Sequence, residues 1–287
     1  MQTAHASEAG WEPISGHRSG VIDFKRLLQG VPGSRDNYEL SLVRTGGDYF
    51  TPRHRHNFDQ VRFCLSGAMN YAPGKDLKAG AVGYFPEGTF YGPQSMTQTS
   101  EVLLLQHGGA AGYGFMSYQQ LTAGYEALRT KGEFDKGAFS YRDADGRVHR
   151  KDGYEAVWEH VNRRAVEYPP PRYDEPVVMN PENFGWIPVP GVRGFEVKHL
   201  GSFGERDVRI GFVRASRGAT YSSRDLSAPE LIFVVEGKLQ LSGEPLGAFG
   251  AARLDAADNG GTVEAIEASE IFFVRLPSFP DTNAQIN

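Results

Sequence analysis

The sequence predicts an all-β protein of two β-rich domains joined by a partly helical connecting region. Short runs of Val, Ile, Leu, Phe and Tyr alternate with turn residues from residue 38 to 107, and the pattern returns from 195 to 277. The two halves can be aligned with each other, whereas the stretch between them has helical spacing. With 287 residues, the chain can form two domains of about 100–150 residues each.

The domain boundaries follow from these patterns. We expect residues 1–15 to be a flexible N-terminus and residues 16–115 to form the first β-domain. Residues 116–175 are the predicted connecting region, and 176–287 the second β-domain.

The connecting region has three recognisable parts. Leu121, Tyr125 and Leu128 recur near helical spacing and predict a helix within 117–132. The stretch "FSYRDADGRVHRKD" places an Asp-Gly turn between alternating flanks, which predicts a hairpin. A second helix is expected in "YEAVWEHVNRRAV", and "EYPPPRYDEP" ends it.

Composition limits the possible partners. The net charge is −5 and no long run of Lys or Arg occurs, so the basic footprint needed for nucleic acid is missing. Cys64, the single cysteine, lies in an apolar run and is expected to be a buried thiol in a reducing compartment. No secretory start and no apolar run of about 18 residues is found, so we expect a cytoplasmic protein without membrane contact.

The stretch "TPRHRHNFDQVRFCLSG" carries a candidate metal site. His54 and His56 are two apart, so on a strand both side chains point to the same side. Gln60 has the same parity if the strand is regular or is re-aimed by a bulge. Three ligand-type side chains would then converge, although a histidine pair with a purely structural role gives the same local pattern.

The second half contains a copy of this stretch without the histidines. The run "VRFCLSG" coincides with "LIFVVEG" when Gly67 is aligned with Gly237, and Gln60 then falls opposite Glu230. In this alignment Leu226 stands at the place of His56, and Arg224 at the place of His54. We therefore expect one metal site, in the first domain, and a structural role for the second domain in packing, in dimerisation or in closing the site of the first domain.

Downstream, "GAVGYFPEGTFYGPQ" spaces a glycine, a proline, a second glycine and a tyrosine. Together the two stretches resemble the two signature motifs of the cupin superfamily. The matching residues are His54, His56, Gln60 and Gly67 for the first motif, and Gly80, Pro86, Gly88 and Tyr91 for the second. The resemblance implies a bicupin, that is, two antiparallel jelly-roll barrels with ligands held in their mouths.

The resemblance also implies a metal. Cupins commonly bind one divalent ion through three histidines and a glutamate; here Gln60 replaces the glutamate and Tyr91 the last histidine. The implied ligands are His54, His56 and Gln60, with Tyr91, His107 or water in the fourth position, around iron first, or else nickel, manganese or zinc. If every ligand is neutral, the ion keeps its whole charge and favours an anionic, chelating substrate.

Arg62 shares the parity of Gln60 and is expected inside the barrel. A buried guanidinium needs a partner, so Arg62 would either bind the substrate anion or pair with a structural acid such as Asp59 or Glu101. Tyr91 is the candidate proton donor or acceptor.

These observations favour a metal-dependent enzyme for a small, oxygen-rich anion, first as a dioxygenase-type oxidoreductase. A lyase or isomerase with a redox-silent metal fits the same ligands. Two further classes stay open: a non-catalytic ligand-binding bicupin and a storage-type bicupin. A homodimer is expected because cupins often pair through sheet edges.

Overall fold

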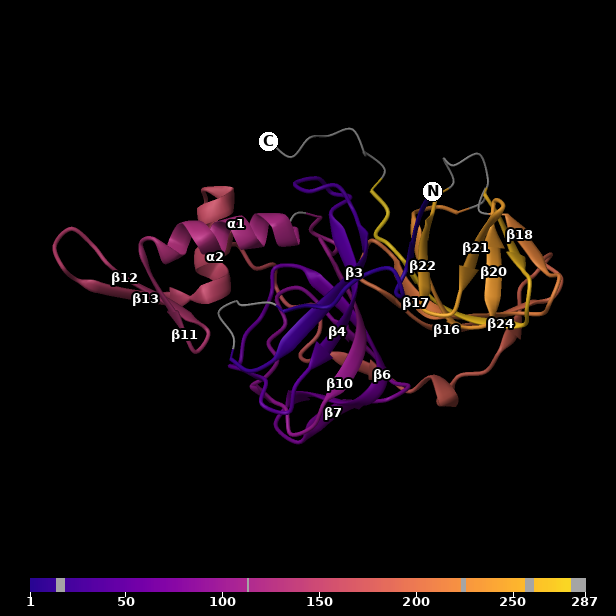
Figure 1. Cartoon of the computed structure of the whole chain (residues 1–287), viewed down its shortest axis with the longest axis horizontal. Coiled ribbons are helices and arrows are strands. Elements are labelled where there is room, and N and C mark those ends of the chain that lie inside the picture. The colour runs from indigo at the N-terminus through magenta and orange to yellow at the C-terminus, as the bar shows by residue number, and fades with distance from the viewer. Residues whose placement is uncertain (14–18, 113, 223–225, 256–260, 280–287) are drawn as a thin grey trace. The chain divides into compact units, whose positions relative to one another are not determined.

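The structure is a computed structural model of the chain, and it describes residues 1–13, 19–112, 114–222, 226–255 and 261–279 (Figure 1). It confirms the all-β prediction. The chain divides into two compact units. The first unit comprises residues 11–24 and 29–178, and the second comprises 1–10, 25–28 and 179–279. Among the residues so described, no helix is long and apolar enough to span a membrane.

The first unit contains a large antiparallel sheet in the order β14-β8-β6-β10-β4-β3-β2, with β7 beside β6 and a separate β5–β9 pair. Its strands are β2 (Glu12–Pro13), β3 (Ile22–Gln29), β4 (Tyr38–Thr45), β5 (Phe50–Thr51), β6 (Asp59–Ala72), β7 (Lys75–Lys78), β8 (Val82–Phe85), β9 (Gln94–Ser95), β10 (Ser100–His107) and β14 (Val177–Met179). The long strand β6 lies between β8 and β10, so the residues that follow the histidine pair run through the middle of the sheet.

The predicted connecting region belongs to the first unit and packs against its barrel. It consists of α1 (Tyr118–Arg129), the meander β11 (Gly132–Asp135), β12 (Ala138–Arg142) and β13 (Val148–Asp152), and α2 (Gly153–Asn162). Both predicted helices and the hairpin are confirmed. Phe58, from the chain just before β6, joins the apolar core of these helices together with Tyr125 and Trp158. We call residues 115–175 the helical insert, because they cover the barrel as well as linking it to the next domain.

The helices begin where their sequences supply caps. Ser117 accepts a hydrogen bond from the backbone N of Gln120, whose side chain in turn accepts one from the backbone N of Ser117, a complete capping box. Asp152 caps α2 by accepting from the backbone N atoms of Tyr154 and Glu155.

The second unit has a sheet in the order β1-β22-β19-β24-β17-β16-β15 and a smaller one in the order β18-β23-β20-β21. Its strands are β1 (Gln2–His5), β15 (Ile187–Pro188), β16 (Phe195–Phe203), β17 (Val208–Ala215), β18 (Thr220–Ser222), β19 (Glu230–Glu236), β20 (Lys238–Leu241), β21 (Glu244–Gly247), β22 (Gly250–Leu254), β23 (Thr262–Ala265) and β24 (Ser269–Arg275); η1 (Pro181–Asn183) precedes β15. Buried apolar side chains such as Leu226, Ile232 and Phe273 pack together in its core.

The N-terminus corrects one expectation. The predicted flexible N-terminus contains an ordered strand, because β1 pairs with β22 in antiparallel register, from Gln2 opposite Arg253 to His5 opposite Gly250. The polar sequence of this segment does not show the apolar pattern of a strand. An edge strand pairs with only one neighbouring strand and can leave its side chains exposed.

The internal repeat is visible in the strand order. The order β8-β6-β10-β4-β3 of the first unit corresponds to β22-β19-β24-β17-β16 of the second. Gly67 and Gly237 have positive φ values of 70° and 89°, and a Cβ on either would lie 2.3 Å from a carbonyl oxygen of Thr99 or Ala268. The aligned glycines therefore make the same close backbone approach in both units. Arg224, aligned with His54, lies outside the described residues.

Candidate active site

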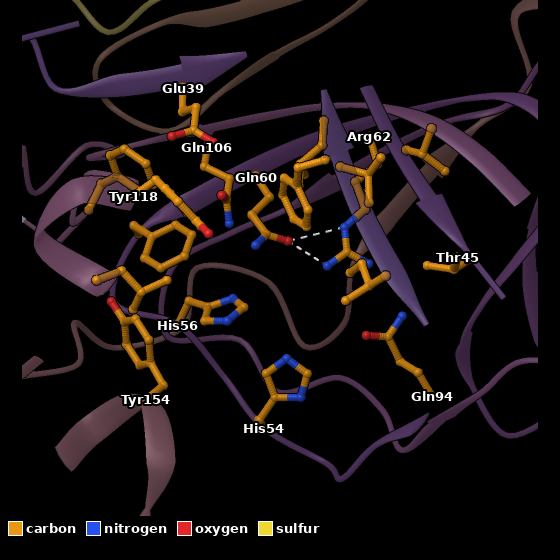
Figure 2. Close-up of a pocket in the computed structure, with 18 of the residues that line it drawn as sticks. Glu39, Thr45, His54, His56, Gln60, Arg62, Gln94, Gln106, Tyr118 and Tyr154 are labelled. Atoms are coloured by element: carbon orange, nitrogen blue, oxygen red, sulfur yellow. Dashed lines mark hydrogen bonds between the residues drawn. The ribbon is translucent and has the colours of Figure 1, made fainter. Parts of the chain in front are cut away.

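A cavity of about 150 Å³ lies inside the barrel of the first unit. Strands β3, β4, β6 and β10 supply part of its lining. The segments that carry His54, His56 and Tyr91 also contribute, as do side chains of the helical insert, including Tyr118 and Tyr154 (Figure 2). The rings of Tyr154 and His56 are 5.4 Å apart between centroids. The helical insert therefore forms a wall of the same cavity that receives the candidate site residues.

Strand register places the polar side chains in rows across the cavity. Gln60 on β6 pairs with Gln106 on β10, which pairs in turn with Glu39 on β4. Arg62 is two residues further along β6 and faces the same side, as its parity predicts. All four side chains line the cavity.

The two signature motifs meet at a backbone bridge. The backbone N of His54 donates to the carbonyl oxygen of Tyr91, and the N of Tyr91 donates to that of His54, both at 2.9 Å. The His54 and His56 rings are 4.9 Å apart between centroids. His54 Nδ1 lies 2.7 Å from the carbonyl oxygen of Pro52, which can only accept, so Nδ1 carries the proton and Nε2 keeps the lone pair.

The guanidinium of Arg62 organises the centre of the cavity. Its Nε and Nη2 donate to Gln60 Oε1 at 3.0 and 2.5 Å, and Nη2 also donates to the Tyr91 hydroxyl at 2.8 Å. Nη1 contacts Met69 Sδ at 3.7 Å, and the guanidinium carbon lies 4.0 Å from the centre of the Phe85 ring. Every one of these partners is neutral.

The acids considered as alternatives for Arg62 are engaged elsewhere. Glu101 pairs with Arg44 at 3.4 Å, and Asp59 accepts from the Tyr84 hydroxyl and from the backbone N of Glu87, both at 2.7 Å. Arg62 is only 5% exposed, and none of the described residues gives it a carboxylate partner. A buried cation with neutral partners is costly, and an anionic ligand would compensate it.

The donor set fits a metal ion through two ligands rather than four. His54 and His56 present imidazole nitrogens to the cavity, and such nitrogens suit iron, nickel, manganese or zinc. The oxygens of Gln60 and Tyr91 instead accept hydrogen bonds from Arg62. No group of three His, Cys, Asp or Glu side chains within the described ranges is placed to hold a metal. Water or substrate oxygens would have to complete the coordination.

His107 lies outside the cavity. On β10 it pairs with Asp59, one residue out of phase with the pair of Gln106 and Gln60, so its side chain points to the opposite face of the sheet. Its Nδ1 accepts from the backbone N of Gly109 at 3.2 Å, and burial lowers its pKa to about 3. His107 is therefore not the fourth ligand of a site at His54 and His56.

The side chain that β10 supplies instead is Gln106, which sequence reasoning missed. Alternation of polar and apolar residues along "EVLLLQH" would have identified it. Apolar residues occupy both faces of this central strand, however, so the sequence does not show which residues face the cavity. The tyrosines of the helical insert were missed because only long-range packing brings them to the barrel.

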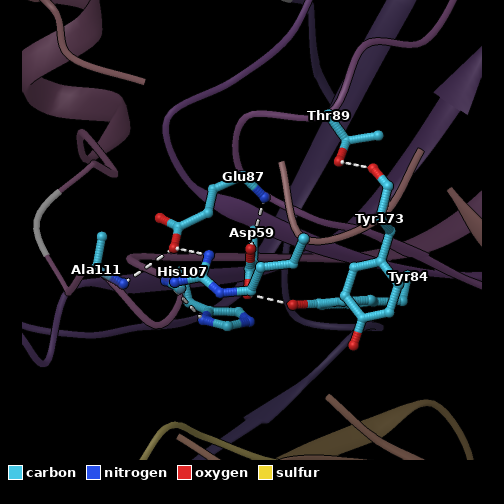
Figure 3. A network of polar contacts seen from close by, with 9 residues as sticks. Asp59, Tyr84, Glu87, Thr89, His107, Ala111 and Tyr173 are labelled. Carbon is cyan, nitrogen blue, oxygen red and sulfur yellow. Dashed lines mark hydrogen bonds and ion pairs between the residues drawn. The ribbon is translucent and has the colours of Figure 1, made fainter. Parts of the chain in front are cut away.

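A buried acid network surrounds His107 (Figure 3). Glu87 Oε1 accepts from Arg172 Nη1 at 2.8 Å and from the backbone N of Ala111 at 3.0 Å. Burial, followed by the charge of Asp59, raises the pKa of Glu87 to about 7, although Ala111 and Arg172 favour its ionised form. This network joins the second motif to the loop after β10 and to the segment that contains Arg172.

Glu87 should make stability depend on pH. Its folded-state pKa lies above its unfolded value of about 4.3, so the stabilisation is complete below the lower value and is lost as pH rises through about 7. Relative to Glu87→Gln, the wild-type free energy of unfolding should fall by about 1–3 kcal/mol between about pH 5 and about pH 8. Urea denaturation measures this, with Glu126→Gln as the exposed-acid control. Parallel pH profiles for wild type and Glu87→Gln would contradict the assignment.

The fold is that of an all-β protein with two jelly-roll domains of the cupin type. No protein-family model and no curated protein sequence matches the chain. Solved structures do match it. A "putative dioxygenase" from Nostoc punctiforme is 11% identical, with a TM-score of 0.58 over 96% of this chain and 82% of that one. A "putative glyoxylate induced protein" from Pseudomonas aeruginosa is also 11% identical, with a TM-score of 0.59 over 95% and 86%.

Oxalate decarboxylase from Bacillus subtilis, a protein with Mn(II) centres, is a third similar structure. It is 14% identical, with a TM-score of 0.52 over 97% of this chain and 78% of that one. At these identities the likeness shows the fold.

Proposed function

We propose that the cavity of the first unit is the active site of a metal-dependent cupin enzyme that acts on a small, oxygen-rich anion. The observation that carries this proposal is the position of Arg62, a buried cation with neutral partners, in the same cavity as His54 and His56. A carboxylate bound to Arg62 would lie beside the two imidazoles. The solved structures of similar fold include a "putative dioxygenase" and a manganese decarboxylase, which supports an enzyme of this kind.

The reaction class that we propose first is a dioxygenase-type oxidation. A divalent metal held by His54 and His56 would supply open positions for substrate oxygens and for O2, the oxidant. Arg62 would bind and orient the carboxylate, and Gln60 would fix the guanidinium by accepting two of its hydrogen bonds. The hydroxyl of Tyr91 lies 3.2 Å from His56 Nδ1 and could move a proton between that ring and the bound substrate.

A second candidate is a binding protein for small anions without metal chemistry. The hydrogen bonds of Arg62 to Gln60 and Tyr91 favour this second candidate. They engage two of the four side chains that the motifs would offer to a metal as ligands. In that case the guanidinium supplies the positive charge of the site, and the histidines serve as hydrogen-bonding groups.

Metal analysis of protein purified without chelator separates the two candidates. We expect about one divalent ion per wild-type chain and almost none in the double variant His54→Ala/His56→Ala. His149→Ala is the control, because this histidine is exposed on β13 and lies outside the cavity. Oxygen consumption with β-diketones, catechols and α-hydroxy or α-keto acids then tests for a dioxygenase.

The opposite result is equally clear. If wild type holds far less than one ion per chain, and added iron, nickel, manganese or zinc does not raise its melting temperature, the metal-dependent proposal is wrong. The binding protein is then the function to pursue. Metal without oxygen uptake would leave a lyase or isomerase.

A further inference from the structure

Gln106 offers the cavity an amide that the protein does not use. Its side chain is half-buried and directed into the cavity, on the same side of the sheet as Gln60 (Figure 2). Within the described part of the chain, the Gln106 amide has no hydrogen-bond partner. The amide of Gln60, by contrast, is held by Arg62. An amide has both donor and acceptor atoms, so Gln106 is equipped to bind a polar group of a ligand.

Gln106 and Arg62 are diagonal neighbours on the sheet. Gln106 pairs with Gln60, and Arg62 pairs with Leu104 on the same strand as Gln106. Diagonal neighbours have Cα atoms about 7–8 Å apart, and both of these side chains are long and directed inward. A molecule whose carboxylate binds Arg62 therefore meets the Gln106 amide only a few bonds from the carboxylate carbon.

The size and lining of the cavity limit the rest of the molecule. A cavity of about 150 Å³ holds a compound of about the size of benzene. Between its polar rows it is lined by apolar side chains such as Val43, Leu104, Phe115 and Leu121. These contacts suit a compact hydrocarbon body.

From these observations we infer that the substrate is a compact monocarboxylate with a hydroxyl, carbonyl or amino group on the first or second carbon after the carboxylate. Arg62 binds the carboxylate, the apolar lining packs on the hydrocarbon body, and Gln106 binds the second polar group. Gln106 is thus the residue that determines specificity. This inference names the substrate class for the proposed active site and rests on that proposal only in using the same cavity.

Binding of three matched acids tests the inference. The probes are 3-methylbutanoate and its 2-hydroxy and 3-hydroxy derivatives, measured by titration calorimetry on the full chain, first with a chelator and then with manganese(II). We expect wild type to bind at least one hydroxy acid about tenfold more tightly than the parent acid. Gln106→Met should abolish that preference and keep the affinity for the parent acid. Gln119→Met, on the exposed face of α1, is the matched control and should keep the preference.

The outcomes separate this inference from the metal proposal. If Gln106→Met keeps the hydroxyl preference, or if wild type prefers the parent acid, the inference is wrong whether or not manganese binds. If the preference disappears in Gln106→Met under chelator and no metal binds to wild type, the inference holds and the metal proposal is wrong. Retained affinity for the parent acid shows that the variant is folded, and equal loss for all three acids would contradict a specific role for Gln106.

Discussion

Replacing Arg62 by methionine should reduce the affinity for small carboxylates by roughly 100-fold, because a buried charged partner contributes about 2–5 kcal/mol to holding an anion. The expected effect on the fold is opposite in sign. The guanidinium is 5% exposed and has neutral partners, so an apolar side chain of similar length removes a buried charge without breaking an ion pair. The free energy of unfolding of Arg62→Met should therefore be equal to or higher than that of wild type.

Calorimetric titration with 3-hydroxy-3-methylbutanoate and urea denaturation measure the two effects. Arg44→Met is the matched control: it breaks an exposed ion pair with Glu101 and should leave the affinity unchanged. A purely structural role for Arg62 predicts the reverse pattern, with a loss of about 2 kcal/mol or more in stability and no change in affinity. That result would remove the main support for an anionic substrate.

The part of the site that could be predicted from sequence is the part that depends on local parity. His54 and His56 are two apart and lie together, and Gln60 and Arg62 face the same cavity. Alternation along a strand predicts the face on which a side chain lies, but not the residue with which it forms a hydrogen bond. The bond between Arg62 and Gln60 Oε1 depends on the reach of two long side chains inside a closed barrel, and spacing alone does not specify it.

The choice between His107 and Gln106 shows a different limit. A one-residue shift moves a side chain to the other face of a sheet, so the phase of β10 decides which of the two enters the cavity. That phase is set by pairing with β4 and β6, because the apolar run before it is buried on both faces.

The two helices of the helical insert were predicted from the sequence. Their position as a wall of the cavity could not be predicted. Gly114, just before the helical insert, lies so close to the barrel that a Cβ on it would be 1.4 Å from the carbonyl oxygen of Asn57. The same Gly114 carbonyl accepts a hydrogen bond from Trp158 Nε1 at 2.9 Å. These contacts join segments more than 40 residues apart in sequence, and local patterns carry no information about them.

Gln60→Glu should lower carboxylate affinity by about 10–100-fold. The new carboxylate would accept the hydrogen bonds that Gln60 Oε1 now accepts from Arg62, form a buried ion pair and cancel the charge that attracts the substrate. Gln60→Met is the companion variant: it removes the acceptor, leaves Arg62 without its main positioning contact and should weaken carboxylate binding while the metal content stays that of wild type. Metal analysis and calorimetric titration of both variants test this assignment. If Gln60 is instead a metal ligand, Gln60→Met loses metal and Gln60→Glu holds it more tightly with carboxylate affinity unchanged, because a negative ligand strengthens a divalent site that otherwise has neutral donors.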